Sequence, residues 1–181
     1  MNRFLIFSLP LVLLLAFSCK TPEGPSRDIP DINVNLTFDQ NGTQLTEISF
    51  SGDEQLVDGN QAANGSYNQL SNLFVMNVNG ALGQVGPSFS YSGDTGGVRS
   101  GSFGVGSSIL NVASFNSAAG ANYQATSGEL TISQVQEFAQ VANIEEFFID
   151  GSISFTMVNQ SDSTDVITAS GTFSGVNIKS N

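Results

Sequence analysis

Short segments of the chain alternate between apolar and polar residues. The first, residues 32–38 (INVNLTF), has an apolar side chain at every second position. A period of two places those side chains on one face of a β-strand. Asn41-Gly42 follows, and this pair readily accepts the positive φ angles of a tight hairpin turn. The pattern therefore predicts that residues 44–51 return as a paired strand, with Ile48 and Phe50 facing inward.

The middle of the chain has a less regular pattern. Residues 70–78 (LSNLFVMNV) form an apolar run, which is typical of a central strand buried on one or both faces. Residues 53–68 are polar and show no sustained period, so we expect a loop there. Further short strands are expected at 89–91, 102–106, 109–115 and 129–133.

The C-terminal third has the clearest strand pattern. Residues 151–157 (GSISFTM) alternate, residues 160–164 are turn formers, and residues 166–178 alternate again, which predicts a hairpin. Almost no helix separates the expected strands, and parallel strands would need long crossover connections. We therefore expect an all-β fold, either an antiparallel β-sandwich or a partly closed barrel.

One short helix is expected at residues 134–143. Ser133 to Gln136 resembles a capping box, which would open this helix. Its apolar residues fall at helical spacing: Val135, Phe138, Ala139 and Ala142. Such a helix would cover one open end of the sheet structure.

The N-terminus has the features of an export signal. Arg3 is followed by an apolar run that ends at Phe17. The run is shorter than the roughly 20 residues that cross a bilayer as a helix, and Pro10 interrupts it. Cleavage after Ser18 by an ordinary signal peptidase would release a soluble protein with a free thiol at its new N-terminus.

The alternative is a lipid anchor on Cys19, the single cysteine of the chain. Ala16-Phe17-Ser18-Cys19 resembles a bacterial lipobox, and in that resemblance Cys19 becomes the acylated mature N-terminus. Several acyl chains supply the two or more signals that stable anchoring requires. We expect residues 1–18 to be a lipoprotein signal peptide, 19–31 a lipidated cysteine with a flexible proline-rich tether, and 32–181 a single β-rich domain.

Composition removes several classes of chemistry. The chain has 16 Asp and Glu against 5 Lys and Arg, a net charge of -11, no histidine and one cysteine. Imidazole-dependent catalysis, internal disulfides and multi-cysteine zinc sites are therefore excluded. Nucleic acid is not an expected partner, because its phosphates require clustered basic side chains. No cofactor is expected.

Acidic side chains and tyrosines are the remaining candidates for binding or catalysis. Asp53, Glu54 and Asp58 could hold calcium through their carboxylate oxygens, although no EF-hand spacing occurs. A glycoside hydrolase needs only two carboxylates, which Glu145, Glu146 and Asp150, or Asp162 and Asp165, could provide. Solvated loops and strand edges are the simpler explanation of these clusters. Tyr67, Tyr91 and Tyr123 could stack on sugars or be ordinary strand residues.

Three strand motifs resemble a succession found in a known group of proteins. They are residues 128–132 (GELTI), 149–155 (IDGSISF) and 167–173 (ITASGTF). Together with the lipobox, the succession resembles that of uncharacterised β-rich lipoproteins of Bacteroidota. The resemblance implies an anchored envelope protein and brings no catalytic residues.

The leading hypothesis is a non-catalytic, lipid-anchored lipoprotein of the outer membrane that acts as a binding, adhesion or accessory module. Its partners would be the membrane, through Cys19, and a carbohydrate, a protein or a small apolar ligand. The alternative is a lipocalin-like carrier, since a barrel of about eight strands can enclose one small ligand. A carboxylate-based hydrolase is the third. The sequence leaves open which face of the membrane the domain occupies and whether it self-associates.

Overall fold

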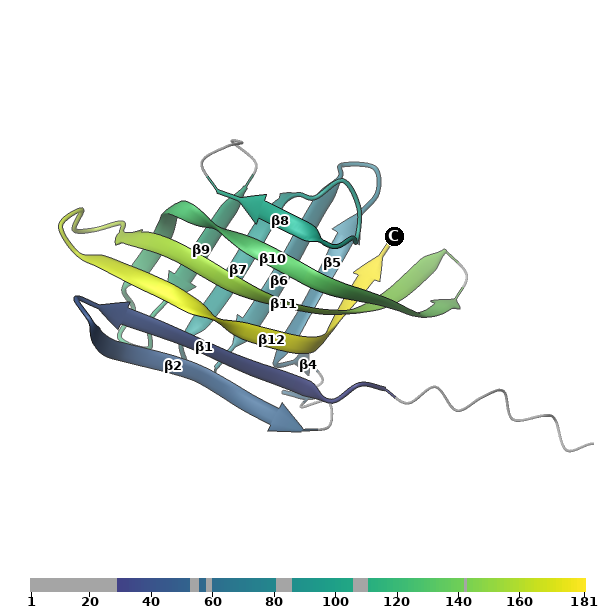
Figure 1. The fold of residues 1–181 in the computed structure, drawn as a ribbon, viewed down its shortest axis with the longest axis horizontal. Coiled ribbons are helices and arrows are strands. Elements are labelled where there is room, and N and C mark those ends of the chain that lie inside the picture. Colours follow the sequence, from purple (N-terminus) through teal and green to yellow (C-terminus); the bar gives the residue numbers. More distant parts are fainter. Residues whose placement is uncertain (1–28, 53–55, 58–59, 81–85, 106–110, 142) are drawn as a thin grey trace, which may run out of the picture.

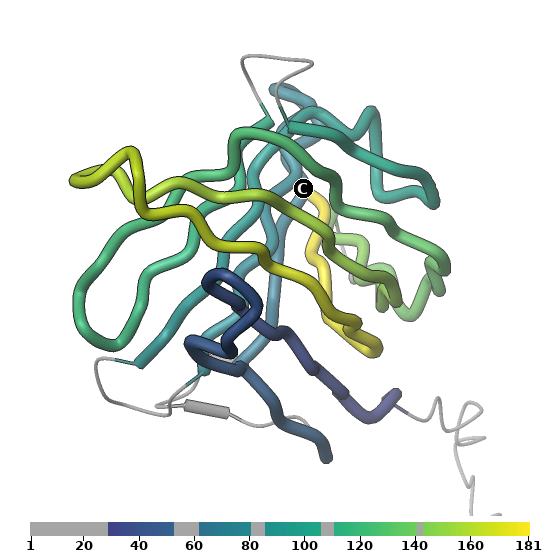
Figure 2. Tube along the Cα trace, turned by 60° about the vertical axis from the view of Figure 1, so that its left-hand side comes forward, coloured from purple at the N-terminus to yellow at the C-terminus, as the bar shows by residue number. Residues whose placement is uncertain are grey.

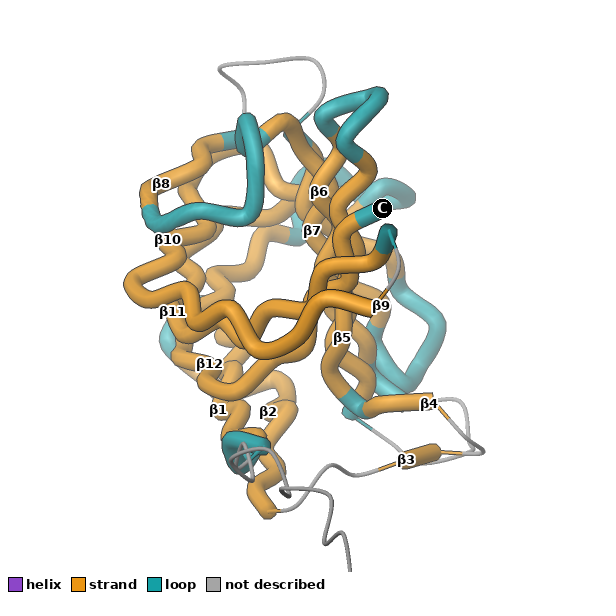
Figure 3. Tube along the Cα trace, turned by 90° about the vertical axis from the view of Figure 1, so that its right-hand side faces the viewer, coloured by secondary structure: helices purple, strands orange, loops and turns teal. Residues whose placement is uncertain are grey.

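The computed structural model describes residues 29–52, 56–57, 60–80, 86–105, 111–141 and 143–181. Every regular element in these ranges is a strand, coloured orange in Figure 3. The strands are β1 (Ile32–Gln40), β2 (Thr43–Gly52), β3 (Leu56–Val57), β4 (Asn60–Gln61), β5 (Ala63–Asn68), β6 (Leu73–Asn79), β7 (Ser88–Asp94), β8 (Gly101–Gly104), β9 (Val112–Asn116), β10 (Asn122–Val141), β11 (Ile144–Asn159) and β12 (Val166–Ser180). In the described part of the chain, no helix is long and apolar enough to span a bilayer.

Two layers of strands enclose the core. The front layer in Figure 1 runs β8-β10-β11-β12-β1-β2, and the back layer runs β9-β7-β6-β5. The layers join where β9 pairs with β10 and where β5 pairs with β12. Strands β5, β6, β7, β9, β10, β11 and β12 thereby form a closed barrel, which β1, β2 and β8 extend. The predicted all-β, partly closed barrel is confirmed.

The barrel closes at β12 and β10, because one edge of each strand pairs with two different strands in succession. The first part of β12 pairs with β1, and its last residues, from Asn177, pair in parallel with β5. Figure 2 shows this final segment leaving the front layer. Similarly, β10 pairs first with β9 and then with β8. Among the described strands, the parallel pairing of β12 with β5 is the exception to the antiparallel arrangement that the sequence predicts.

A glycine stands at each change of partner. Gly175 in β12 has φ +66, and a Cβ there would collide with the carbonyl oxygen of Asp31. Gly128 in β10 has φ +108, and a Cβ there would collide with the Ser154 carbonyl oxygen. Only glycine adopts such a conformation without strain while the neighbouring backbone approaches this closely.

Both predicted hairpins are confirmed. Asn41 (φ 53) and Gly42 (φ 78) form the turn between β1 and β2. Both φ angles are positive, as a type I′ turn requires. Ile48 is fully buried and Phe50 packs against the core. The C-terminal hairpin, β11 and β12, pairs from Val158 with Val166 onward.

The helix expected at 134–143 is wrong. Residues 134–141 belong to β10 and pair with β11, while Ala142 lies outside the described residues. Two register shifts, one between Ile132 and Gln134 and one between Glu137 and Ala139, each insert one extra residue into β10. These bulges change the spacing of the half-buried side chains, so Val135 and Phe138 imitate a helical period. Phe138 packs edge-on against Phe148, with ring centroids 5.0 Å apart.

Two other expectations need correction. The loop expected at 53–68 contains β5, whose backbone pairs with both β6 and β12 although its sequence (ANGSYN) has little strand character. The strand expected from residue 70 begins at Leu73, and Leu70 is almost fully exposed. The expected strands at 102–106 and 109–115 correspond to β8 and β9, with residues 106–110 outside the described ranges.

Aromatic rings fill the centre of the described core. Phe38 of β1 stacks on Phe115 of β9 with centroids 3.8 Å apart. Phe89 lies 6.4 Å from Phe38 and 6.0 Å from Phe155. These contacts join the front layer to the back layer, and such ring pairs add stability beyond the area they bury.

Candidate functional site

The three tyrosines are inside the protein. Tyr67, Tyr91 and Tyr123 are at most 7% exposed. Stacking on a sugar requires an accessible ring face, so the sugar-binding interpretation of these residues does not fit their positions. All three tyrosines lie in strands, as the other interpretation predicts, and each hydroxyl donates a hydrogen bond within the protein.

Tyr91 is the most enclosed of the three. Its hydroxyl donates to the carbonyl oxygen of Phe103 at 3.3 Å. Burial, followed by the nearby negative charge of Asp94, raises its pKa to about 12. A phenol that stays protonated over the whole physiological range cannot serve as a general base.

Tyr123 belongs to a network around Asp165. The Tyr123 hydroxyl donates to Asp165 Oδ2 at 2.8 Å, and Asn159 Nδ2 donates to the same oxygen at 2.9 Å. Gln40 Nε2 donates to Asp165 Oδ1 at 2.5 Å. These hydrogen bonds hold the pKa of Asp165 below its usual value, and the bond from Asn159 has the largest effect. We call these four residues the Asp165 network; it ties together β10, the β11–β12 turn and the end of β1.

Two of the remaining acidic candidates have partners within the fold. Asp162 accepts hydrogen bonds from the amide and hydroxyl of Thr164, which lowers its pKa and stabilises the turn. Glu146 forms an ion pair with Lys179 at 3.6 Å. Asp53, Glu54 and Asp58 lie outside the described residues, as does Cys19. Among the described residues, no three acidic or cysteine side chains are grouped to hold a metal ion.

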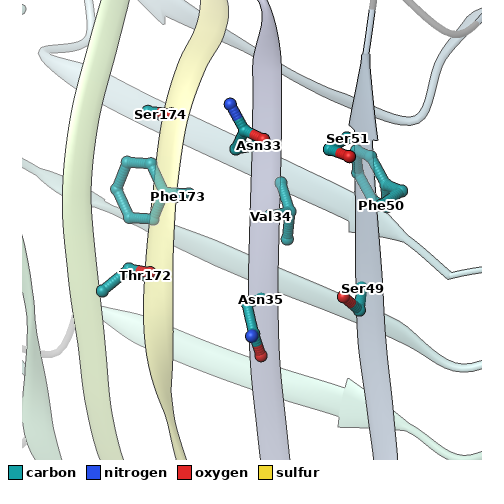
Figure 4. Close-up of a pocket in the computed structure, with 9 residues that line it drawn as sticks. All are labelled: Asn33, Val34, Asn35, Ser49, Phe50, Ser51, Thr172, Phe173 and Ser174. Atoms are coloured by element: carbon teal, nitrogen blue, oxygen red, sulfur yellow. The ribbon is translucent and has the colours of Figure 1, made fainter.

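A groove of about 490 Å³ crosses β12, β1 and β2 (Figure 4). Three residues of each strand line it: Thr172, Phe173 and Ser174; Asn33, Val34 and Asn35; Ser49, Phe50 and Ser51. No lining residue comes from the opposite layer, which lies behind the three strands in Figure 4. The groove therefore opens on the outer surface of the front layer, away from the core.

The register of the strands arranges these side chains in rows. Asn35 pairs with Thr172 on one side and Ser49 on the other. Asn33 likewise pairs with Ser174 and Ser51. Val34 stands between the two rows and points into the core, where it is buried. The two outward rows consist entirely of amide and hydroxyl side chains.

One row continues across the whole front layer. Thr172 pairs with Ser152 of β11, Ser152 with Thr131 of β10, and Thr131 with Ser102 of β8. We call this set the hydrogen-bonding row: Ser102, Thr131, Ser152, Thr172, Asn35 and Ser49. Adjacent strands lie about 4.8 Å apart, so the row is roughly 24 Å long.

The polar groups of the groove are unpaired. Asn33, Asn35, Ser49, Ser51, Thr172 and Ser174 form no side-chain hydrogen bond with the described part of the protein. Elsewhere on the outer surfaces such groups often bond to one another: the Ser102 and Thr131 hydroxyls are 3.0 Å apart, and those of Ser90 and Ser114 are 2.8 Å apart. The groove thus presents free donors and acceptors to solvent.

Sequence reasoning recognised Asn33 and Asn35 only as the outward positions of a strand. Alternation was the available signal, and it identifies the face but not the neighbours on other strands. Ser102 and Ser49 lie far apart in sequence, and only strand pairing places them in one row.

Three kinds of comparison, with models of protein families, with curated proteins and with solved structures, found no match for this chain.

Proposed function

We propose that this protein is a non-catalytic binding module that a lipid on Cys19 holds at the bacterial outer membrane. The outer face of the front layer binds the ligand. The groove across β12, β1 and β2 carries this proposal, because its six polar side chains have no partner in the described part of the protein. The other prominent polar groups, the tyrosine hydroxyls and Asp165, already bond within the fold.

The ionisable side chains support a binding role without catalysis. The chain contains no histidine. The one strongly perturbed tyrosine pKa is raised rather than lowered, so Tyr91 is held neutral. The lowered pKa of Asp165 accompanies three hydrogen bonds that join strand ends, which is a structural task.

The anchor is tested by replacing Cys19 with serine in the full chain. Cells fed an alkynyl fatty acid should label the wild-type protein and leave Cys19→Ser unlabelled, and the variant should move from the membrane to the soluble fraction. Equal labelling of the two proteins would overturn the anchor and with it the proposed location.

A carrier of a small apolar ligand is the second candidate, and closure of the barrel favours it. The stacked rings between the layers occupy the described interior, which leaves the outer groove as the preferred site. Native mass spectrometry of the full-length protein, released from mild detergent, separates the two. A co-purifying mass of a few hundred daltons beyond the acyl chains would favour the carrier.

A further inference from the structure

We infer that the hydrogen-bonding row binds a linear, uncharged glycan that lies across the strands, with the groove as its main contact. This inference rests on the proposed binding function and names its ligand class. The ligand would run from β2 toward β8, perpendicular to the strands of the front layer (Figure 1).

The side chains of the row match the hydroxyl groups of a sugar chemically. Serine and threonine hydroxyls both donate and accept, and an asparagine amide offers two donors and an acceptor. A sugar hydroxyl also donates and accepts, so each contact can form in either direction. In the groove, these groups are free of competing partners within the described part of the chain.

The charges on and around the row favour an uncharged ligand. The row contains no ionisable side chain, and the neighbouring outward row, Glu129, Ser154, Ser170, Thr37 and Glu47, carries acidic groups only at its two ends. A chain with net charge -11 repels an anionic ligand. No lysine or arginine lies in either row to attract one. An uncharged ligand meets no such barrier.

The polarity of the row does not suit a protein partner. Stable protein interfaces usually centre on a buried apolar or aromatic anchor. The row has none: the exposed large apolar residues of the front layer, Leu45, Ile144 and Val166, all lie outside it. A line of short polar side chains instead suits a long, narrow ligand that makes many similar contacts. A linear glycan of several sugars is needed to reach from one end of the row to the other.

The test is binding of full-length protein in detergent micelles to an array of linear hexasaccharides. The neutral members are cello-, xylo-, manno- and maltohexaose, and hexagalacturonate is the anionic one. We expect at least one neutral hexasaccharide to bind. The double variant Asn33→Ala/Asn35→Ala should weaken that binding about tenfold or more, because the groove loses the two amides of its middle strand, β1. Asn79→Ala is the matched control, since Asn79 is exposed on β6 of the opposite layer.

Each contrary result overturns a different statement. Binding of a neutral glycan that the double variant leaves unchanged would exclude the groove as its site. Binding of hexagalacturonate that the double variant weakens would retain the proposed binding face and overturn the uncharged ligand. If no hexasaccharide binds, the inference that the ligand is a glycan is wrong. The lipid anchor on Cys19 is tested separately, by acyl labelling.

Discussion

The Asp165 network and the outer groove are built from the same kinds of side chain, yet they differ in whether those side chains are paired. In the network, Asn159 and Gln40 direct their amides at one carboxylate, and Tyr123 adds its hydroxyl. In the groove, Asn33 and Asn35 have no such partner in the described structure. An internally bonded polar group stabilises a fold, whereas an unpaired group on the surface remains available to a ligand.

Both regions depend on the path of β12, so the largest expected effect is at Gly175. Gly175→Ala should lower the free energy of unfolding by at least about 2 kcal/mol, because the positive φ costs about 1–2 kcal/mol and the new Cβ meets the Asp31 carbonyl oxygen. Urea denaturation measures the loss. Gly120→Ala is the control, since Gly120 has φ +86 but open space around it. Equal losses in the two variants would show that close packing at Gly175 contributes nothing.

The pH dependence of stability should distinguish the charged network from the neutral groove. Because the pKa of Asp165 is lowered in the folded protein, its carboxylate stabilises the fold above the usual pKa of 3.8, and this stabilisation is lost as the pH falls below that value. Asp165→Asn should therefore lower Tm at pH 7, and the difference from wild type should shrink below about pH 4.

Glu47→Gln is the control for this measurement, because Glu47 accepts one exposed hydrogen bond, from Gln44. Its Tm should follow that of wild type throughout. A difference between wild type and Asp165→Asn that stays constant with pH would contradict a role for the charge.

Substitution of the same residue type in the two regions gives the most direct comparison. Asn159→Ala removes a donor to Asp165 and an acceptor for the Ser161 amide, so it should cost about 1–2 kcal/mol. Asn35→Ala should change stability by no more than about 0.5 kcal/mol, because the residue is exposed and unpaired within the described protein. Thermal melts of the two variants measure both values. Similar losses would mean that Asn35 has a structural partner.

A smaller loss than that of Asn159→Ala is expected at Tyr91, an uncharged polar group of the interior. The pKa of Tyr91 rises from 10.0 to about 12 on folding, so the stability that its neutral hydroxyl provides is complete below pH 10 and is lost as the pH approaches 12. The tyrosinate absorbance of the native protein should show one group that ionises last. Tyr91→Phe should remove that step and cost at most about 1 kcal/mol at neutral pH. Persistence of the late step would assign it to Tyr123, whose pKa is also raised.

The sequence alone determined the local parts of this protein. Period-two alternation predicted β1, β2 and the C-terminal hairpin, and Asn41-Gly42 predicted the first turn, because side-chain direction and turn conformation depend on adjacent residues. The same reasoning identified an all-β fold. It also identified the outward faces of the strands, including Asn33 and Asn35, without their neighbours.

Only the tertiary structure decided how distant strands meet. The parallel pairing of β12 with β5, and the strand conformation of ANGSYN, depend on hydrogen bonds that neighbouring strands supply. Residues 134–141 of β10 form a strand despite their apparent helical period, because β11 pairs with them and the bulges set the register. Pairing across six strands likewise placed Ser102 and Ser49 in one row. Such contacts join residues far apart in the chain, and no local pattern encodes which strand edge will receive which partner.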